Sequence, residues 1–304
     1  MGLLPSLILT ITHKCNLRCR FCPVIKDNAS MHKDVALKAA SLFFKKNKNK
    51  NLFIKFFGGE PLLNFALVKK VIGSIDRKYP GRNIQFNLTT NGLLVNNSII
   101  CFLKKFPNIG LLLSLDGDRS VRAIGRSLGR LLELPDIGVN LTLTPNNVER
   151  FSYNFLHLVK LGFKKFNFLP AYFIQWEKFK IDVLEFEFKI VGNLIRSLAK
   201  SGHRLEIKNI KTYSPTPLFN NGMVVECNGD IFRNNLILSK HFSYLRPQLK
   251  IGNVNDSKRI NWLRKTDFNK VIRDNLDNET YNSTLKVDSI LTNFVLTLGK
   301  KWKE

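Results

Sequence analysis

The sequence predicts an α/β fold, a partial (β/α)6 TIM-like barrel with a small C-terminal α+β appendage. In the first two-thirds of the chain, short apolar runs alternate with amphipathic segments of helix length, a pattern typical of a parallel sheet. Glycine-containing polar motifs follow several of these runs, at the positions where a barrel carries its active site. After about residue 203 shorter β-like runs replace this alternation, which indicates a second structural region.

Six short apolar runs are expected to form the parallel strands. The segments between them carry apolar residues at helical spacing; residues 62–79, for example, place Phe65, Val68 and Ile72 on one face. Right-handed crossovers would wind the strands into an open barrel. The expected strands are residues 7–11, 52–57, 84–88, 110–115, 139–143 and 165–169.

The predicted domain organisation has three parts. Residues 1–203 form the barrel domain and residues 204–257 form an extension. Residues 258–304 form a C-terminal segment that we expect to be helical. The short β-like runs of the extension are residues 205–207, 223–226 and 231–232.

The chain has a globular composition with a large excess of positive charge. Its 48 Lys and Arg residues against 23 Asp and Glu give a net charge of +25. Such a charge attracts nucleic acid and other polyanions, but the lysines are spread along the chain, and compositional drift would produce the same excess. No apolar run reaches the about 20 residues that span a membrane, so we expect a soluble, cytoplasmic protein without membrane insertion.

Three of the five cysteines lie close together after the first expected strand. Cys15, Cys19 and Cys22 bring three thiolates into one short loop, which suits a metal centre in a reducing compartment better than a disulfide framework. A structural zinc site needs four ligands, and neither Cys101 nor Cys227 belongs to a second close pair. The count therefore favours an iron–sulfur cluster with one open iron.

The cysteine motif, with Phe21 directly before the last cysteine, resembles the signature of the radical S-adenosylmethionine (SAM) superfamily. Further motifs similar to those of that family follow in order at the next expected strand ends. They are Gly58-Gly59-Glu60-Pro61, Thr90-Asn91-Gly92 and Ser114-Leu115-Asp116-Gly117. The resemblance implies one 4Fe–4S cluster on Cys15, Cys19 and Cys22, with SAM at its open iron.

The resemblance also implies which residues contact SAM. The loop at residues 58–61 would bind the SAM amino group with a contribution from Glu60, since its two glycines lack a Cβ and would leave backbone groups free for a cofactor. Phe21 would lie near the adenine. Thr90 and Asn91 are expected to complete the cofactor site.

Two further elements match the family less directly. Ser114 and Asp116 match an element that contacts the methionine or ribose part of SAM in relatives, although Asp before Gly is equally good turn chemistry. Arg126 ends a stretch that aligns with a V-H-D-x-x-R segment of peptide-modifying relatives, and it could hold the SAM carboxylate; the other interpretation is a surface cation. Arg122 and Ala123 replace the His and Asp of that segment.

The extension resembles a SPASM or twitch extension, whose cysteines carry auxiliary clusters in that family. Residues 223–234 and 251–254 match its framework. Asn234 stands where a cluster cysteine would be and Cys227 where an acidic residue usually falls, so auxiliary clusters are expected to be lost. Cys101 and Cys227 are then expected to be structural, with Cys101 a small buried apolar residue.

By this resemblance the protein is expected to be an enzyme of oxidoreductase type. An external one-electron donor of the flavodoxin or ferredoxin type would reduce the cluster, and SAM would yield a 5′-deoxyadenosyl radical that takes hydrogen from a peptide or protein. The sequence nominates no catalytic acid or base. The alternatives are a nucleic-acid-modifying radical SAM enzyme, suggested by the charge, and a non-catalytic iron–sulfur relative, suggested by the altered motifs.

Overall fold

The computed structural model describes residues 5–22, 24–49, 51–211 and 221–301 of the 304-residue chain. It divides into two compact units, each described by itself below. The first strand and the extension share a sheet within one of these units, and the division expected at residues 203 and 257 stays a prediction. The first unit comprises Met1–Leu94, Cys101–Leu111 and Phe219–Asp267, and the second comprises Val95–Ile100, Leu112–Leu218 and Phe268–Glu304.

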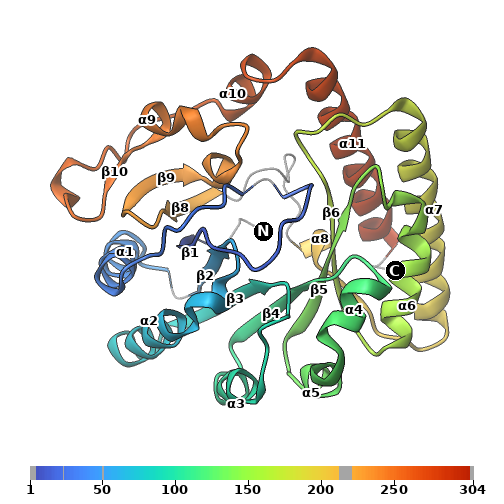
Figure 1. Cartoon of the computed structure of the whole chain (residues 1–304), viewed down its shortest axis with the longest axis horizontal. Helices are drawn as coiled ribbons and strands as arrows, with labels where there is room; N and C mark the ends of the chain where they lie inside the picture. The colour runs from blue at the N-terminus through green and yellow to red at the C-terminus, as the bar shows by residue number, and fades with distance from the viewer. Residues whose placement is uncertain (1–4, 23, 50, 212–220, 302–304) are drawn as a thin grey trace. The chain divides into compact units, whose positions relative to one another are not determined.

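Three parallel strands and their connecting helices form the first part of the first unit (Figure 1). The strands β1 (Ser6–Thr12), β2 (Asn51–Gly58) and β3 (Asn83–Thr90) pair in that order. The connections are α1 (Lys33–Lys46), η1 (Pro61–Asn64) and α2 (Phe65–Lys78). Every residue of β1 is buried, as expected for a strand of a parallel sheet that is covered on both faces.

The extension continues the sheet of the first unit. Its strand β8 pairs parallel with β1, with Val225 opposite Leu9. A Cβ on Gly222 would lie 2.2 Å from Ser6 Oγ, so only glycine allows this close approach. The pairing carries Glu226 to the end of β1. The elements are β8 (Asn221–Val225), β9 (Asp230–Asn234), η4 (Asn235–Leu238), η5 (Ser243–Leu245), α9 (Arg246–Leu249), β10 (Gly252–Asn253) and η6 (Ser257–Arg259).

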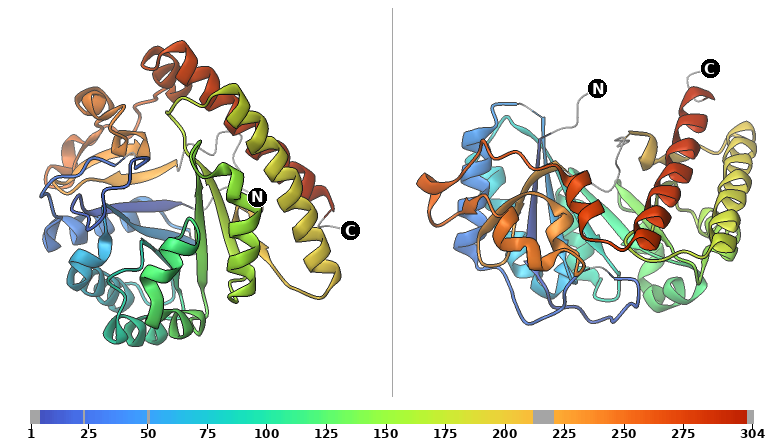
Figure 2. Two further views of the ribbon diagram at one scale, coloured as in Figure 1. Left: turned by 45° about the vertical axis from the view of Figure 1, so that its right-hand side comes forward. Right: turned by 90° about the horizontal axis from the view of Figure 1, so that it is seen from above.

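The second unit repeats the alternation of strand and helix around an aromatic core. Its strands β5, β6 and β7 pair in parallel, and the long helices α7 and α11 pack side by side (Figure 2). The core rings are Phe151, Phe155, Phe166, Phe168, Phe188 and Phe294. The elements are α4 (Asp118–Ile124), η2 (Gly125–Ser127), α5 (Leu128–Leu132), β5 (Ile137–Leu143), η3 (Val148–Arg150), α6 (Phe151–Lys160), β6 (Lys165–Pro170), α7 (Lys178–Lys200), β7 (Glu206–Ile207), α8 (Lys208–Lys211), α10 (Phe268–Asp274) and α11 (Asn278–Lys301).

The C-terminal helix α11 holds the segment that follows β6. The Thr284 hydroxyl accepts a hydrogen bond from Phe173 N at 3.1 Å, and the Tyr172 hydroxyl donates to Asp288 Oδ1 at 3.2 Å. Phe173 has a φ of 62°, a conformation that a residue with a Cβ adopts only when its surroundings impose it. Burial raises the pKa of Asp288 to about 6. The C-terminal segment was expected only to be helical. Its helix α11 also fixes the backbone that follows β6.

The predicted fold class is confirmed, since the chain forms a mixed α/β structure with parallel strands at the expected places. Two elements are divided between the units: α3 (Asn97–Lys105) and β4 (Ile109–Ser114). The expectation for Cys101 is wrong. Its side chain is exposed, because α3 buries Ile99, Ile100 and Leu103 on a face that Cys101 does not share.

None of the helices in the described ranges is long and apolar enough to cross a bilayer.

Candidate cofactor site at the strand ends

The cysteine loop follows β1 and alternates half-buried cysteines with exposed polar side chains. Cys15 and Cys19 are half-buried, while Arg18 and Arg20 are exposed. The Lys26 ammonium donates a hydrogen bond to Leu17 O at 2.5 Å, and this bond joins the segment after the cysteines to the segment between them. Leu17 N donates to Cys15 Sγ at 3.4 Å and Cys22 N to Cys19 O at 3.2 Å, so the loop is built from tight local turns.

The three cysteines fit an iron–sulfur cluster by donor type and number, since all three are thiols outside any disulfide in a single loop. Across the described residues, however, no group of three or more His, Cys, Asp or Glu side chains is arranged to hold a metal ion. The assignment of Cys15, Cys19 and Cys22 as ligands therefore stays a prediction.

The loop at residues 58–61 is pressed against the end of β1. Gly59 N donates to Thr12 O at 2.7 Å and Glu60 N to Lys14 O at 2.8 Å. A Cβ on Gly58 would lie 2.1 Å from Thr12 O, and one on Gly59 would lie 2.2 Å from Lys14 O. The expectation that the two glycines leave their backbone groups free is thus wrong for the amide of Gly59. The glycines are required because the loop packs directly on the backbone of the cysteine loop.

Glu60 joins the ends of β2 and β3. Its carboxylate is only 1% exposed and accepts hydrogen bonds from Leu62 N at 3.0 Å, Thr90 Oγ1 at 2.7 Å and Asn91 N at 2.8 Å. Burial raises the pKa of Glu60, and these three donors oppose that rise. Asn91 also donates from its side chain to Asn16 Oδ1 at 2.8 Å, inside the cysteine loop. Three of the predicted motifs are therefore linked in one place.

Pro61 and Phe21 belong to the same region. Pro61 is buried and begins η1, for which Glu60 is the N-cap. Phe21 is half-buried next to Cys22.

The remaining predicted residues lie in the second unit. Ser114, at the end of β4, and Asp116 are both exposed. Asp116 N donates to Ser120 Oγ at 3.0 Å, and Asp116 O accepts from Asn154 Nδ2 at 2.9 Å, so this turn is held by protein groups. Arg126 belongs to the 3-10 turn η2, and its side chain lies outside the described residues. A role in SAM binding for these residues stays a prediction.

An ionic network centred on two buried side chains links the cysteine loop to the extension. His13 Nε2 contacts Glu226 Oε2 at 2.9 Å, and both side chains are about 5% exposed or less. Asp27 Oδ2 contacts His13 Nδ1 at 3.0 Å, and Arg246 Nη2 contacts Glu226 Oε2 at 3.0 Å. The hydrogen bond to Glu226 raises the pKa of His13 against the effect of burial, and the hydrogen bond from His13 lowers the pKa of Asp27. We call these four residues the loop clamp.

Sequence reasoning gave the loop clamp no role. Its members lie in four separate stretches, and His13 and Glu226 are 213 positions apart. The only signal was indirect: His13 precedes the first cysteine by two residues, and Glu226 lies in the matched hairpin framework.

Cys227 and Asn234, the two positions of the extension compared with the SPASM framework, both have hydrogen-bond partners within the protein. The Cys227 thiol donates to Thr10 O at 3.1 Å, and burial raises its pKa to about 12, so it stays protonated at neutral pH. Asn234 is 1% exposed and accepts from Leu236 N at 2.6 Å, which caps η4. Both residues thus have structural contacts, and the loss of auxiliary clusters stays a prediction.

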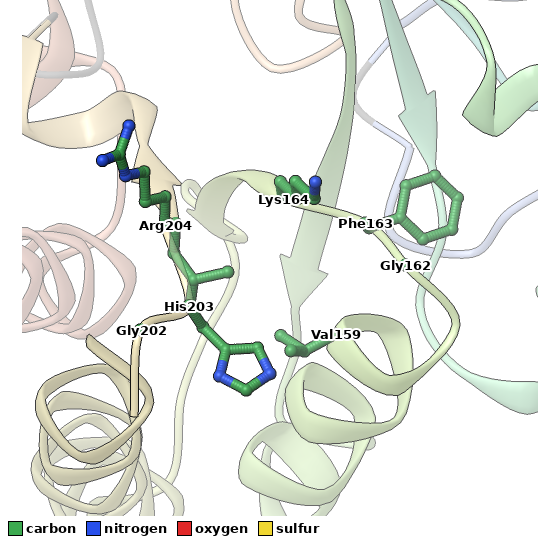
Figure 3. Close-up of a pocket in the computed structure, with 8 residues that line it drawn as sticks. Val159, Gly162, Phe163, Lys164, Gly202, His203 and Arg204 are labelled. Atoms are coloured by element: carbon green, nitrogen blue, oxygen red, sulfur yellow. The ribbon is translucent and has the colours of Figure 1, made fainter. Parts of the chain in front are cut away.

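An open cavity of about 460 Å³ lies elsewhere in the second unit (Figure 3). Phe163 and Lys164 reach it from the turn after α6, and His203 and Arg204 from the segment after α7. These residues precede β6 and β7, so the cavity lies at the amino ends of these strands. The predicted cofactor residues lie at carboxyl ends, and the cavity therefore belongs to a different part of the fold.

The protein is of the α/β class. Its neighbouring parallel strands carry a three-cysteine loop, a glycine–glutamate loop and an asparagine turn at their carboxyl ends, where such folds place their active sites. Residues 9–131 match the family described as the radical SAM superfamily. Over this stretch the chain is similar to the radical SAM superfamily, in agreement with the resemblance of its motifs.

Two relatives align with 36% of the chain each. An uncharacterized protein of Methanocaldococcus jannaschii is 36% identical over 113 residues, which cover 38% of its own length. The radical SAM cyclopropyl synthase TigE of Paramaledivibacter caminithermalis is 29% identical over 125 residues, which cover 26% of its length. The match therefore covers less than half of either relative.

Solved structures share the fold over most of the chain. Native anSMEcpe with bound AdoMet and the Cp18Cys peptide has a TM-score of 0.74 at 16% identity, over 98% of this chain and 99% of that chain. SuiB of Streptococcus suis bound to S-adenosylmethionine has a TM-score of 0.59 at 16% identity, over 92% of this chain and 67% of that chain. At these identities the likeness shows the fold.

Proposed function

We propose that the protein is a radical SAM enzyme that modifies a peptide or protein. When bound, the 4Fe–4S cluster and SAM would supply a 5′-deoxyadenosyl radical that abstracts hydrogen from the substrate. The observation that carries the proposal is the meeting of three motifs in the first unit, where hydrogen bonds join the cysteine loop, residues 58–61 and the Thr90–Asn91 turn. The superfamily match over residues 9–131 supports it.

In this proposal the cysteine loop and its neighbours bind the cofactors. Cys15, Cys19 and Cys22 would hold the cluster through their thiolates. Residues 58–61 would face the SAM amino group, and Phe21 would contact the adenine. Glu60 would act mainly by keeping two strand ends in register, because its carboxylate is already bonded to Thr90 and Asn91.

Three further residues are proposed to contact SAM. Ser114 and Asp116 are exposed at the end of β4 and would contact the methionine or ribose part. Arg126 would hold the SAM carboxylate as a bidentate cation.

A peptide is the proposed substrate because peptide-bound proteins share this fold. anSMEcpe was solved with the Cp18Cys peptide, and SuiB with its precursor peptide SuiA. TigE, which shares the radical SAM segment, is a cyclopropyl synthase. Hydrogen abstraction from a peptide carbon is the reaction class that we infer.

The electron is proposed to come from an external acidic carrier of the flavodoxin or ferredoxin type. Lys14, Arg18 and Arg20 are exposed around the half-buried cysteines. Positive charge attracts an acidic carrier and speeds its encounter. The excess of charge over the whole chain, +25, acts in the same direction.

The test is SAM cleavage by the purified 304-residue protein. We would reconstitute it anaerobically with iron and sulfide, reduce it with dithionite, add SAM and measure 5′-deoxyadenosine by chromatography. Cys19→Ala should abolish the product, whereas Cys101→Ala, a matched loss of an exposed thiol outside the loop, should leave it unchanged. A cluster that forms in the unaltered protein without cleaving SAM would favour the non-catalytic alternative.

A further inference from the structure

The extension contacts the cysteine loop on both sides of its three cysteines. On one side His13, two residues before Cys15, contacts Glu226 at 2.9 Å. On the other side Val24, two residues after Cys22, forms an antiparallel bridge with Ser239. Both Val24 and Ser239 are buried. The stretch that carries the predicted cluster ligands is therefore held at its two ends by residues more than 200 positions away in the chain.

His13 also closes the base of the cysteine loop. Its backbone N donates to Ala29 O at 2.9 Å, and the Thr12 hydroxyl donates to the same oxygen at 2.8 Å. Its imidazole contacts Asp27 within the loop and Glu226 outside it. A shift of His13 would therefore move the start and the end of the loop together.

The Glu226 carboxylate is held through one of its two oxygens among the described residues. Its Oε2 meets both His13 and Arg246, while its Oε1 is buried without a hydrogen-bond partner among the described residues. A buried carboxylate oxygen without a donor is unfavourable. The other oxygen contacts two basic side chains, His13 from the start of the cysteine loop and Arg246 from the start of α9.

We propose that Glu226 is a positioning residue for the 4Fe–4S cluster. Through His13 it fixes the cysteine loop, so the extension shapes the cluster site although the cysteines for auxiliary clusters are absent. This inference rests on the proposed function, since it concerns the cluster that Cys15, Cys19 and Cys22 would hold. Residues that contact the ligands of a metal centre, and not the metal itself, orient those ligands and tune the properties of the centre.

The first test needs no metal and measures thiol reactivity in the cluster-free 304-residue protein. Glu226→Gln and Glu226→Ala should let a small alkylating reagent reach Cys15, Cys19 and Cys22 faster, by about tenfold for Ala and less for Gln, because local opening exposes the loop. Exposed Cys101 is the internal reference and should react at an unchanged rate.

The matched control is Glu185→Gln, which removes an exposed ion pair with Lys189. It should leave the reactivity of the loop cysteines unchanged. Equal alkylation of these cysteines in all variants would overturn the proposal, and so would an increase that Cys101 shows equally, since that would indicate general unfolding.

The second test is electron paramagnetic resonance of the reduced, reconstituted protein with and without SAM. Glu226→Gln, which keeps the size of the side chain, should change the spectrum and its response to SAM, while Glu185→Gln should not. An unchanged spectrum in Glu226→Gln would contradict the proposal. Failure of the unaltered protein to cleave SAM, with the alkylation difference intact, would count against the proposed function and leave the positioning of the loop supported.

Discussion

The first and second units secure their strand ends in different ways. In the first unit the ends of β1, β2 and β3 are bonded to one another, through Glu60 and through the backbone of residues 59 and 60. In the second unit they are bonded to helices: Asp116 O accepts from Asn154 of α6, and the segment after β6 is held by α11.

This difference explains why only the contacts at the strand ends of the first unit leave a recognisable sequence motif. Loops that pack on each other's backbone need particular residues, such as Gly59, at particular places, and these residues form a motif. A segment held by hydroxyl and carboxylate groups of a distant helix leaves no short pattern, because Tyr172 and Asp288 are 116 positions apart.

The comparison predicts that replacing glycine with alanine is strongly destabilising in the motif loop of the first unit and harmless in a helix of the second unit. Gly59→Ala should lower the free energy of unfolding by about 4 to 5 kcal/mol or prevent folding, because the Cβ would meet Lys14 O at 2.2 Å. Gly129→Ala in α5 meets no atom within 4 Å and should stabilise by up to about 1 kcal/mol. Urea unfolding measures both, and equal stabilities would show that residues 58–61 do not depend on close packing.

Glu60→Ala should cost about 3 to 4 kcal/mol, because two buried donors and one partly buried donor lose their acceptor. Glu149→Ala, which removes an exposed partner of Lys180, should cost less than about 1 kcal/mol. SAM affinity, measured by calorimetry on the reconstituted protein, should fall for Glu60→Ala alone. Unchanged stability of Glu60→Ala would mean that Thr90 and Asn91 find other acceptors.

Asp288 should give the second unit a pH dependence that the amide removes. Its pKa is raised from 3.8 to about 6, so the folded state binds the proton more tightly than the unfolded state. Stability should therefore fall as pH rises from about 4 to 6, by at most about 3 kcal/mol. Over this window the Asp288→Asn variant should become more stable relative to the unaltered protein. Urea unfolding at pH 4 and pH 7 measures this change in the free energy of unfolding. A constant difference between the two proteins would contradict the raised pKa.

The smallest expected effect concerns the exposed charges of the cysteine loop. Arg18→Glu with Arg20→Glu should slow cluster reduction by an acidic flavodoxin about tenfold at low salt. Reduction by dithionite should stay unchanged, and so should flavodoxin reduction in a control with Lys104→Glu and Lys105→Glu on α3. If both double variants slow cluster reduction by flavodoxin equally, the effect comes from net charge and not from a docking surface.

The strands and the motif loops could be predicted because their causes are local. Apolar runs such as the one in β1, buried along its whole length, are recognisable at once. The extension was predicted as an appendage, yet β8 joins the sheet beside β1. That pairing depends on a glycine, Gly222, whose close contact with Ser6 no sequence spacing reveals.

The amino-acid sequence by itself determined the alternation of strand and helix, the three cysteines in one loop and the motifs at successive strand ends, because each depends on neighbours within a few residues. Only the tertiary structure decided which groups meet across long separations. His13 and Glu226 pair in the core because β8 lies next to β1, and Asp288 reaches Tyr172 because α11 packs on α7. Such contacts follow from the packing of whole elements, which local patterns do not encode.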